Sequence, residues 1–482
     1  MPSNSNNIPL IIDLDGTFSK SDTLAESIIL FISKNIFNIF LIMKWLLKGK
    51  IYLKNQLIKQ VQINPEDIPY NKDVQSFVLN ERKKRNKIVL CSGSHKDQVK
   101  LIFEYFDYFD DYYGSNKDVN LVGKNKSNFL VENYGKNNFD YIGNSVDDLD
   151  VWKESRNIYL VNVSNRLKRK LFSLEKKIIE ISNKEKFFDK VLIFFKTLRV
   201  HQWVKNLLIF LPLFFSQPYY QFNAVKSSIL GFISFSLIAS LIYIINDSVD
   251  LQNDRKNPSK KNRTIASGDI SISNAFLIGV LLLIFSIFLS IFFLNYYFLL
   301  ILFIYISLNL AYSFYLQKIV LIDILILSFF YILRIYSGGV ISGIEVSIWL
   351  TLYSFFLFTY LATIKRLAML SAKKLYNNEG YYGIYHSYYS KLLFLLLLIS
   401  GISSIILFTV YLKSEKVINL YHNPNLLFFI IPIMIYWLVR IFIKTKNGKM
   451  NDDLILFVLK DKTTWLCALL TFSILVIQLK IW

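Results

Sequence analysis

Three oxygen-bearing side chains recur at four-residue intervals in residues 243–268, which read YIINDSVDLQNDRKNPSKKNRTIASG. On a helix, the spacing of Asn246, Asp250 and Asp254 places them on one face, one turn apart. Such close carboxylates repel one another, but together they can hold Mg²⁺ bridged to a diphosphate. A solvated loop is the plain alternative, and the regular spacing argues against it. Basic residues able to pair with phosphates follow at once: Arg255, Lys260, Lys261 and Arg263.

A second acidic pair ends an apolar, β-branched run near the N-terminus, IPLIIDLDGTFSKSDTL. The run predicts a strand, and Asp13 and Asp15, at positions i and i+2, then share one face of it. One carboxylate could attack a phosphorus atom while the other moves protons, with Mg²⁺ reducing their mutual repulsion. For a lone DxD, an acidic turn after a strand would be the simpler interpretation.

Three later segments favour chemistry over a plain turn. KIVLCSGS is a strand-like run containing Ser92, whose hydroxyl can donate a hydrogen bond to a phosphoryl oxygen. GKNKSNFL places Lys126 at a predicted helix start, where a fixed positive charge suits a phosphate in transfer. FDYIGNSVDDLDVW is a third strand-like run, ending near Asn144 and Asp148, whose oxygens suit Mg²⁺.

In this order, these segments resemble the four motifs of the haloacid dehalogenase superfamily over roughly residues 8–165. The resemblance implies a Rossmann-like α/β fold with a small helical cap, Asp13 as the nucleophile that forms an aspartyl-phosphate, and Asp15 as the general acid/base. It further implies that Ser92 and Lys126 hold the phosphate. The implied metal ligands are Asp13, Asp15, Asn144 and Asp148. The superfamily usually has Asp where this chain has Asn144, which removes one formal charge, so a working phosphatase and a degenerate regulatory domain both stay open.

Residues 246–268 resemble the signature of the UbiA-type intramembrane prenyltransferase superfamily, NDxxDxxxDRxxPxKxxRxIAxG, and fill every fixed place in it. The resemblance implies an all-α bundle of nine transmembrane helices around a pocket, with Mg²⁺ and diphosphate at the acidic motifs. Hydropathy independently predicts nine spanning segments. They lie near residues 206–222, 225–246, 272–294, 296–316, 319–339, 346–364, 391–412, 425–444 and 463–481.

Within that superfamily, three segments look most like decaprenyl-phosphate phosphoribosyltransferases, from about residue 196 to 375. They are LRVHQWVKNLLIFLPLF, YSFYLQKIVLIDILILSFFYILRIYSGG and the pair Lys365-Arg366. Those enzymes move 5-phosphoribose from phosphoribosyl diphosphate onto a polyprenyl phosphate, so both substrates bring phosphates. Groups expected to bind them are Lys205, Asn206, Arg255, Lys260, Arg263, Lys318, Lys365 and Arg366. Taken singly, each lysine or arginine at a span end could equally be an ordinary anchor on the positive side of the membrane.

The predicted fifth span carries two further candidates. Asp323 stands at its start and is the expected metal ligand of a second acidic motif. Aromatic prenyltransferases commonly have a second Asp four residues after the first, but this chain has Leu327 there. This difference argues against an aromatic prenyltransferase. Arg334 lies about 16 Å deeper at 1.5 Å per residue, where an arginine must be paired or face a wet cavity. We therefore also expect Arg334 to bind substrate.

Composition separates the two parts of the chain. The 482 residues are 53% hydrophobic, and apolar blocks of spanning length recur only from Leu207 onward. This predicts a phosphatase-like domain at 1–165, a basic amphipathic linker at 166–195 and a transmembrane domain at 196–482. The net charge of +20 gathers in loops on one side, which indicates cytoplasmic loops and not nucleic-acid binding. Residues 27–48 are apolar but interrupted, and favour a bilayer-surface or capping helix over a span.

The N-terminus lacks the features of a signal peptide, and Cys91 and Cys467 fall in different domains, so we expect a cytoplasmic front domain on a bacterial-type inner membrane protein. The combined expectation is a bifunctional Mg²⁺ enzyme that makes a polyprenyl-phosphoryl-ribose 5-phosphate and removes the 5-phosphate. An aromatic prenyltransferase with an accessory phosphatase, an anion or lipid transporter and an inactive scaffold remain as alternatives. The polyprenyl length and the oligomeric state stay open.

Overall fold

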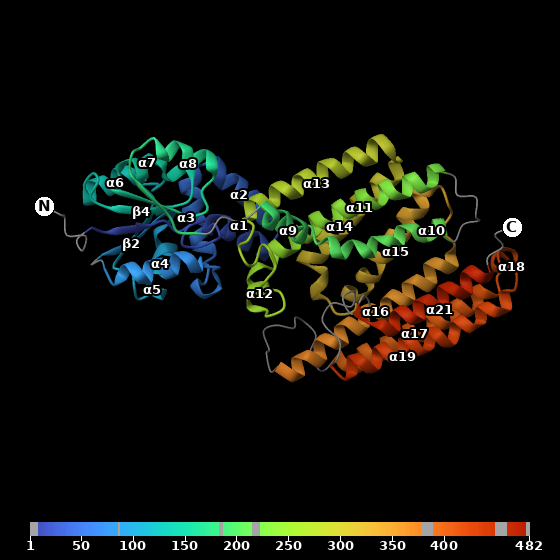
Figure 1. The fold of residues 1–482 in the computed structure, drawn as a ribbon. Coiled ribbons are helices and arrows are strands. Elements are labelled where there is room, and N and C mark those ends of the chain that lie inside the picture. The colour runs from blue at the N-terminus through green and yellow to red at the C-terminus, as the bar shows by residue number, and fades with distance from the viewer. Residues whose placement is uncertain are drawn as a thin grey trace. The chain divides into compact units, whose positions relative to one another are not determined.

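The computed structural model describes residues 8–84, 87–182, 187–214, 222–376, 389–448 and 460–478 (Figure 1). The chain divides into two compact units. One comprises Met1–Leu198 with Tyr243–Gly279, and the other comprises Arg199–Ile242 with Val280–Trp482. The segment with the four-residue acidic spacing therefore belongs to the first unit.

The first unit is built on a parallel sheet of six strands in the order β3-β2-β1-β4-β5-β6. The central strand β1 lies between β2 and β4, and its three residues are fully buried. Burial on both faces explains why the strand sequences read as continuous apolar runs. The strands are β1 (Leu10–Ile12), β2 (Ile88–His95), β3 (Asp111–Ser115), β4 (Asp140–Gly143), β5 (Asn157–Leu160) and β6 (Lys177–Glu180).

Helices cover both faces of this sheet. Leu10 and Ile12 point into one apolar core and Ile11 into a second one, because successive side chains of a strand face opposite sides. The first core contains residues of α4 (Lys72–Arg82) and α5 (Lys96–Tyr105). The second contains residues of α6 (Lys124–Tyr134), α7 (Leu149–Glu154) and α8 (Asn165–Phe172). This is the α/β architecture that the three strand-like runs predict.

The sheet extends further along the chain than the sequence suggested. The predicted linker, residues 166–195, contains α8, β6 and most of α9 (Phe187–Thr197). Strand β6 pairs in parallel with β5, from Asn157 with Lys177 to Leu160 with Glu180. The domain boundary therefore lies beyond Glu180 and not at residue 165. The error has a simple cause, since an edge strand with exposed Lys177 and Glu180 looks like a polar connection.

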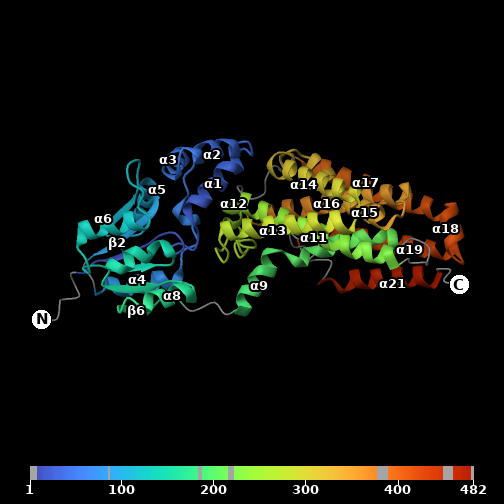
Figure 2. The same cartoon turned by 90° about the horizontal axis from the view of Figure 1, so that it is seen from above.

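Three helices form a cap between β1 and β2: α1 (Thr23–Lys34), α2 (Asn38–Leu47) and α3 (Lys50–Gln60). Figure 2 shows them side by side at one end of the sheet. The backbone leaves the helical conformation at Asn35, with φ −160° and ψ 126°, so residues 27–48 form two helices and no single span. A 3-10 turn, η2 (Pro65–Asp67), then leads to α4.

The second unit is helical, and seven described helices are long and apolar enough to cross a membrane. These seven agree with seven of the nine predicted spans, including the N-terminal part of α16. The ninth corresponds to the shorter apolar helix α21, and the first falls on η4, α10 and residues outside the described part. The nine-helix count is therefore not confirmed. Helices α11 and α13 continue from one unit into the other.

After residue 199, the described helical elements of the chain begin with η4 (Val200–Phe210), α10 (Leu211–Phe214), α11 (Phe222–Val249), α12 (Leu251–Lys256) and α13 (Ile272–Phe293). They continue with α14 (Tyr296–Phe314), η5 (Leu316–Lys318), α15 (Ile322–Ser342), α16 (Ile348–Tyr376) and α17 (Ser390–Leu412). The last are α18 (Glu415–Leu420), η8 (Pro424–Phe429), α19 (Ile430–Lys446) and α21 (Lys462–Gln478).

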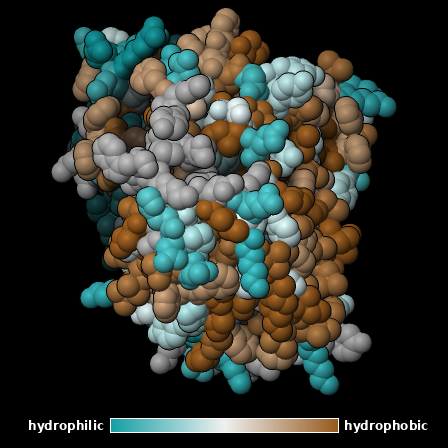
Figure 3. Space-filling view, turned by 90° about the vertical axis from the view of Figure 1, so that its right-hand side faces the viewer, coloured by the Kyte–Doolittle hydropathy of each residue, from teal (hydrophilic) through white to brown (hydrophobic). Residues whose placement is uncertain are grey.

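Hydrophobic side chains cover much of the face shown in Figure 3. The exposed fractions agree with this: Ile284, Phe285 and Phe292 of α13 are each more than half exposed. Exposed apolar surface on this scale would be costly in water but suits lipid. The interior is tightly packed: a Cβ on Gly338 of α15 would lie 1.9 Å from the carbonyl oxygen of Ile209 in η4. Glycine at this position lets the two backbones touch.

Candidate active sites

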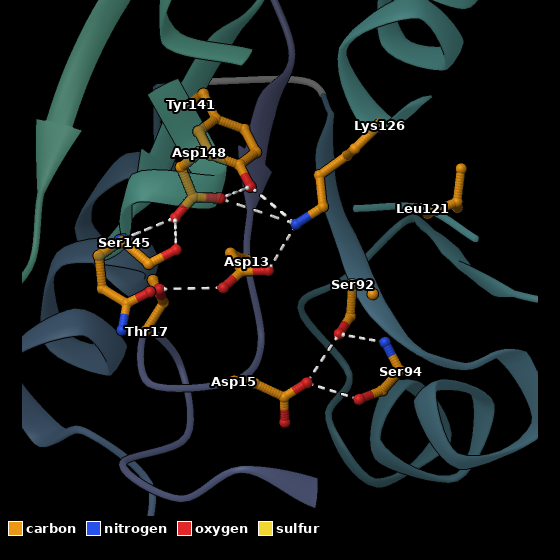
Figure 4. A network of polar contacts seen from close by, with 12 residues as sticks. Asp13, Asp15, Thr17, Ser92, Ser94, Leu121, Lys126, Tyr141, Ser145 and Asp148 are labelled. Atoms are coloured by element: carbon orange, nitrogen blue, oxygen red, sulfur yellow. Dashed lines mark hydrogen bonds and ion pairs between the residues drawn. The ribbon is translucent and has the colours of Figure 1, made fainter. Parts of the chain in front are cut away.

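The carboxylate of Asp13 lies at the carboxyl end of β1, buried against a lysine from another element. Lys126, in the first turn of α6, places its Nζ 2.7 Å from Asp13 Oδ1 and 3.0 Å from the hydroxyl of Tyr141 (Figure 4). Thr17 donates a hydrogen bond to the other oxygen of Asp13 at 3.2 Å. The parallel sheet brings these residues together, because its strands end at one edge.

Asp148, which follows β4, contacts the same group of residues. Tyr141 donates its hydroxyl proton to Asp148 Oδ1 at 2.7 Å, and the backbone N–H groups of Asn144 and Ser145 donate to Oδ2 at 3.0 Å. Lys126 Nζ is 3.8 Å from Asp148. The side chain of Asn144 lies beside Gly16, where an added Cβ would be only 2.1 Å from its Nδ2. Asn144 is thus placed next to the acidic loop after β1.

Asp15 is fixed by groups from β2 and from the cap. Ser92 and Ser94 donate to Asp15 Oδ2 at 3.1 Å and 2.5 Å, and the backbone N–H of Thr23 donates to Oδ1 at 2.8 Å. Ser94 and Thr23 were missed by the sequence analysis. Ser94 was detectable in principle, because it stands two positions after Ser92 and so shares its face of the strand. Thr23 acts through its backbone, which no side-chain pattern reveals.

Electrostatics couple the charged groups of this site. Burial raises the pKa of Asp13 to about 7, and Lys126 opposes that rise. Burial lowers the pKa of Lys126, but the neighbouring Asp13 and Asp148 outweigh it and keep the lysine charged. A buried, permanently charged ammonium beside a carboxylate is suited to hold a phosphoryl group as charge develops on it.

A second lysine reaches this site from the cap. Lys54 of α3 donates to the carbonyl oxygen of Gly93 at 2.6 Å and to Asn120 Oδ1 at 2.9 Å. Burial lowers the pKa of Lys54, whereas Asp15 and Asp22 raise it. No sequence signal marks this residue, because it belongs to no motif and is one of several lysines in the cap.

The donor set of this site fits Mg²⁺ in chemical type. Asp15 and Asp148 both raise the pKa of Asp13, so each of these two carboxylates lies close enough to repel Asp13. Oxygen ligands of this kind are what Mg²⁺ prefers. Among the described residues, however, no three His, Cys, Asp or Glu side chains already converge as a metal site. In this structure Lys126 and the backbone of residues 144–145 bind those oxygens.

The segment from α11 into α12 keeps the three acidic-motif residues in helical register. The N–H of Asp250 donates to the carbonyl oxygen of Asn246, and the N–H of Asp254 donates to that of Asp250, both at 2.9 Å. They are therefore one turn apart, as their spacing predicts. Asp254 is buried, and Arg263 bridges it to Asp247 at distances of 2.5 Å and 3.0 Å. Asp247, which lies outside the predicted site, thus belongs to this cluster.

The cations that follow this segment have different partners. Lys260 Nζ is 3.8 Å from Asp254. Burial raises the pKa of Asp254, while Arg263 and Lys260 lower it. Arg255 instead pairs with Glu26 of the cap helix α1 through both terminal nitrogens, at 2.9 Å and 2.5 Å. Its Nε donates to the carbonyl oxygen of Ala266. The expected phosphate-binding role of Arg255 stays a prediction, and in this structure its partner is a carboxylate.

In the second unit, Asp323 at the start of α15 is completely buried. Arg366 of α16 donates to it at 2.6 Å, and the hydroxyl of Tyr312 donates at 2.7 Å. Lys365 is half-buried next to Arg366, and Lys318 is exposed in η5. Tyr312 is a further site residue that the sequence analysis missed. It had no signal, because tyrosine is common in the apolar helices.

Arg334 lies buried farther along α15 among neutral acceptors. It donates to Asn206 Oδ1 at 2.8 Å, to the carbonyl oxygen of Phe330 at 2.6 Å and to the hydroxyl of Tyr305 at 2.9 Å. The structure therefore brings together two predicted substrate ligands, Arg334 and Asn206. Lys205 precedes Asn206 in η4 and is half-buried. The contact fixes η4 on α15, where Gly338 already allows close packing.

Comparison with known proteins identifies the class. The UbiA prenyltransferase family matches residues 207–459, more than half of the chain. The chain therefore belongs to the UbiA prenyltransferase family, and its apolar helices make it an integral membrane protein. The described sheet of the same chain forms an α/β domain, with Asp13 directly after its central strand.

Relatives are similar over different shares of the chain. An uncharacterised protein, y4nM of Sinorhizobium fredii, is 33% identical over 98% of this chain and 91% of its own length. Decaprenyl-phosphate phosphoribosyltransferase of Corynebacterium glutamicum is 35% identical over 36% of this chain and 53% of its own length. The enzyme of the same name from Mycolicibacterium smegmatis is 35% identical over 36% of this chain and 56% of its own.

Two solved structures are weakly similar to parts of the chain. A UbiA homologue from Archaeoglobus fulgidus bound to GPP and Mg²⁺ is 19% identical, with TM-score 0.45, over 58% of this chain and 99% of its own. A phospho-aspartyl intermediate analogue of phosphoserine phosphatase is 14% identical, with TM-score 0.27, over 39% of this chain and 99% of its own.

Proposed function

We propose that this chain transfers 5-phosphoribose from phosphoribosyl diphosphate to a polyprenyl phosphate and then removes the 5-phosphate. In the first step an oxygen of the lipid phosphate attacks the anomeric carbon, the bond from that carbon to the diphosphate breaks, and pyrophosphate leaves. In the second step the phosphate ester at the ribose 5-position is hydrolysed to inorganic phosphate. The product is polyprenyl-phosphoryl-ribose, made at the cytoplasmic face of an inner membrane.

The observation that carries the transfer step is the acidic helical stripe of Asn246, Asp250 and Asp254 with Arg263 directly against it. Two relatives that are similar over 36% of this chain are named as decaprenyl-phosphate phosphoribosyltransferases. Asn246, Asp250 and Asp254 of the first unit are proposed to hold Mg²⁺. Asp323 of the second unit is proposed separately as a metal ligand. When bound, Mg²⁺ would neutralise charge on the leaving diphosphate. Lys205, Lys260, Lys318 and Lys365, with Arg255 and Arg366, are proposed to bind substrate phosphates.

The hydrolytic step is proposed for the sheet domain. Asp13 attacks the phosphorus and forms an aspartyl-phosphate, while Asp15 gives its proton to the departing ribose oxygen. Asp15 then takes a proton from water, which attacks the phosphorus and releases phosphate, so the enzyme returns to its first state. Lys126 and Ser92 hold the phosphoryl oxygens. The hydrogen bonds that fix Asp15 support this role, because a general acid must stay in one position.

The test uses the purified full-length chain with Mg²⁺, labelled phosphoribosyl diphosphate and a polyprenyl phosphate. Pyrophosphate should appear first and phosphate second. Asp13→Asn should stop phosphate release and leave pyrophosphate release intact, whereas Asp97→Asn, at an exposed acid of the same domain, should change neither. Pyrophosphate release that is independent of the lipid phosphate would contradict the proposal. Prenyl transfer to an aromatic acid would favour the aromatic branch instead.

A further inference from the structure

Helix α2 of the cap exposes an apolar surface that no other described residue covers. Of its ten residues only Ile42 is buried. The exposed fractions reach 66% at Phe40, 59% at Met43 and 90% at Leu47. The remaining exposed apolar residues of this surface are Phe37, Ile39, Leu41 and Leu46. A helix that only capped a water-soluble domain would turn such residues inward.

The outward face of α2 is nevertheless fixed in place. Ile42 belongs to the apolar core beneath the cap, and the ring of Trp45 stacks on Phe31 with centroids 5.2 Å apart. Asn38 donates its side-chain N–H to the carbonyl oxygen of Phe31 at 2.8 Å. The helix is therefore held by one narrow side, and its apolar residues point away from the domain as a defined surface.

Charge around this surface has one sign. No Asp or Glu occurs between Glu26 and Glu66, whereas this stretch contains six lysines. Lys54 is turned inward to the candidate phosphatase site. Three others, Lys44, Lys48 and Lys50, are exposed in or beside the apolar helix. Exposed lysines next to Phe, Leu and Met are the composition of helices that lie in the interface of anionic membranes.

We propose that α2 is a membrane-docking helix, whose apolar surface enters the headgroup boundary of an anionic bilayer. Its ten residues measure about 15 Å at 1.5 Å per residue, half of a bilayer core of about 30 Å, so it lies in the interface and does not span. A bilayer fits this surface better than a protein partner, because the same chain carries seven candidate spans and is thus always beside lipid. The surrounding lysines complement anionic headgroups.

Docking has a consequence for the sheet site. The cap begins at Thr23, whose N–H holds Asp15, so a cap resting on lipid keeps the acidic loop near headgroups. That consequence rests on the phosphatase activity proposed above, whereas the docking itself does not. A test of docking should therefore measure whether α2 contacts lipid, and not the rate of catalysis.

The experiment attaches an environment-sensitive fluorophore to Phe40→Cys in the full-length chain, reconstituted in nanodiscs of phosphatidylcholine with phosphatidylglycerol. Both natural cysteines are buried, so the unaltered chain serves as the labelling blank. The matched control is Leu79→Cys on α4, an apolar residue of the same unit that is 49% exposed. At position 40 we expect a blue-shifted emission and at least twofold quenching by lipids with a nitroxide on the acyl chain. At position 79 we expect neither.

Equal quenching at the two positions would overturn the proposal. A blue shift at position 40 without lipid quenching would also overturn it, because protein would then cover the surface. Concentration-dependent loss of that shift would identify a second copy as the cover. A second variant tests whether the lysines attract anionic headgroups. Lys44→Glu combined with Lys48→Glu should weaken the lipid quenching at position 40 in anionic nanodiscs. Unchanged quenching would refute this role of the lysines.

Discussion

The two candidate sites obtain their positive charges from different distances along the chain. In the sheet domain, Asp13 is paired with Lys126, which lies 113 residues away and reaches it only when β1, α6 and β4 are in place. In the acidic segment, Asp254 of α12 is paired with Arg263, only nine residues away in the turn region that follows the helix. The first arrangement therefore depends on the whole domain fold, and the second can form within one local segment. Substitutions at the Asp13–Lys126 pair should therefore reduce both the activity and the stability of the sheet domain. Substitutions at the Asp254–Arg263 pair should reduce activity and leave the stability of the sheet domain unchanged.

The largest expected effect is at the long-range pair. Lys126→Met removes the fixed charge beside Asp13, and we expect phosphate release to fall about 10³-fold, the scale of losing one preorganised electrostatic group. The variant should also unfold at lower temperature, because two buried carboxylates lose their partner. Phosphate release and thermal unfolding are measured together. Lys124→Met, at the exposed start of the same helix, is the control, and equal effects there would refute the comparison.

The local pair should lose activity without losing stability. Arg263→Gln leaves Asp254 and Asp247 without their shared guanidinium, and we expect pyrophosphate release to fall about 10²-fold, since a charged contact to a diphosphate is lost. Unfolding of the sheet domain should stay unchanged. Asn262→Ala, at an exposed neighbour, should be nearly neutral. A loss of sheet stability in Arg263→Gln would show that the segment is not energetically local.

A third change tests the contact between Arg255 and Glu26. Their side chains are 7% and 1% exposed, so removing either partner leaves a buried charge. Glu26→Ala and Arg255→Ala should each cost about 2–3 kcal/mol, and the double variant should cost less than the sum. Hydrogen exchange of α1 amides reports these energies. Additive effects would mean that the pair contributes no coupling, and Arg255 would then be available for phosphate.

The smallest expected effect is at Asp15. Ser94→Ala removes one of three hydrogen bonds to this carboxylate, and those from Ser92 and the N–H of Thr23 remain. A single hydrogen bond to a charged group contributes about 1.5 kcal/mol, so phosphate release should fall roughly tenfold. Steady-state phosphate release measures it, and Ser76→Ala on the exposed face of α4 is the control. If Ser94→Ala lowered phosphate release as much as Lys126→Met, the Ser94–Asp15 contact would not be the weaker of the two contacts, which would contradict this prediction.

The residue types and their spacing along the chain predicted those features that depend on neighbouring residues alone. The strands β1, β2 and β4, the helix start at Lys126 and the stripe of Asn246, Asp250 and Asp254 all follow from residue type and spacing. Contacts such as Lys54 to Gly93 and Tyr312 to Asp323 could not be predicted, because tertiary packing alone brings those residues together. Strand β6 was missed because an edge strand has little burial to mark it. The first predicted span, 206–222, overlaps only the end of η4 (Val200–Phe210), because hydropathy does not distinguish a 3-10 helix from an α-helix.

The placement of β1 at the centre of the sheet has a consequence for biosynthesis. The strand is translated first, but its neighbours β2 and β4 end only at His95 and Gly143. A ribosome must therefore deliver most of the domain before its middle strand is paired on both sides. The last strand ends at Glu180, well ahead of α11 at Phe222, so the growing chain can complete this sheet before the first long apolar helix reaches the insertion machinery.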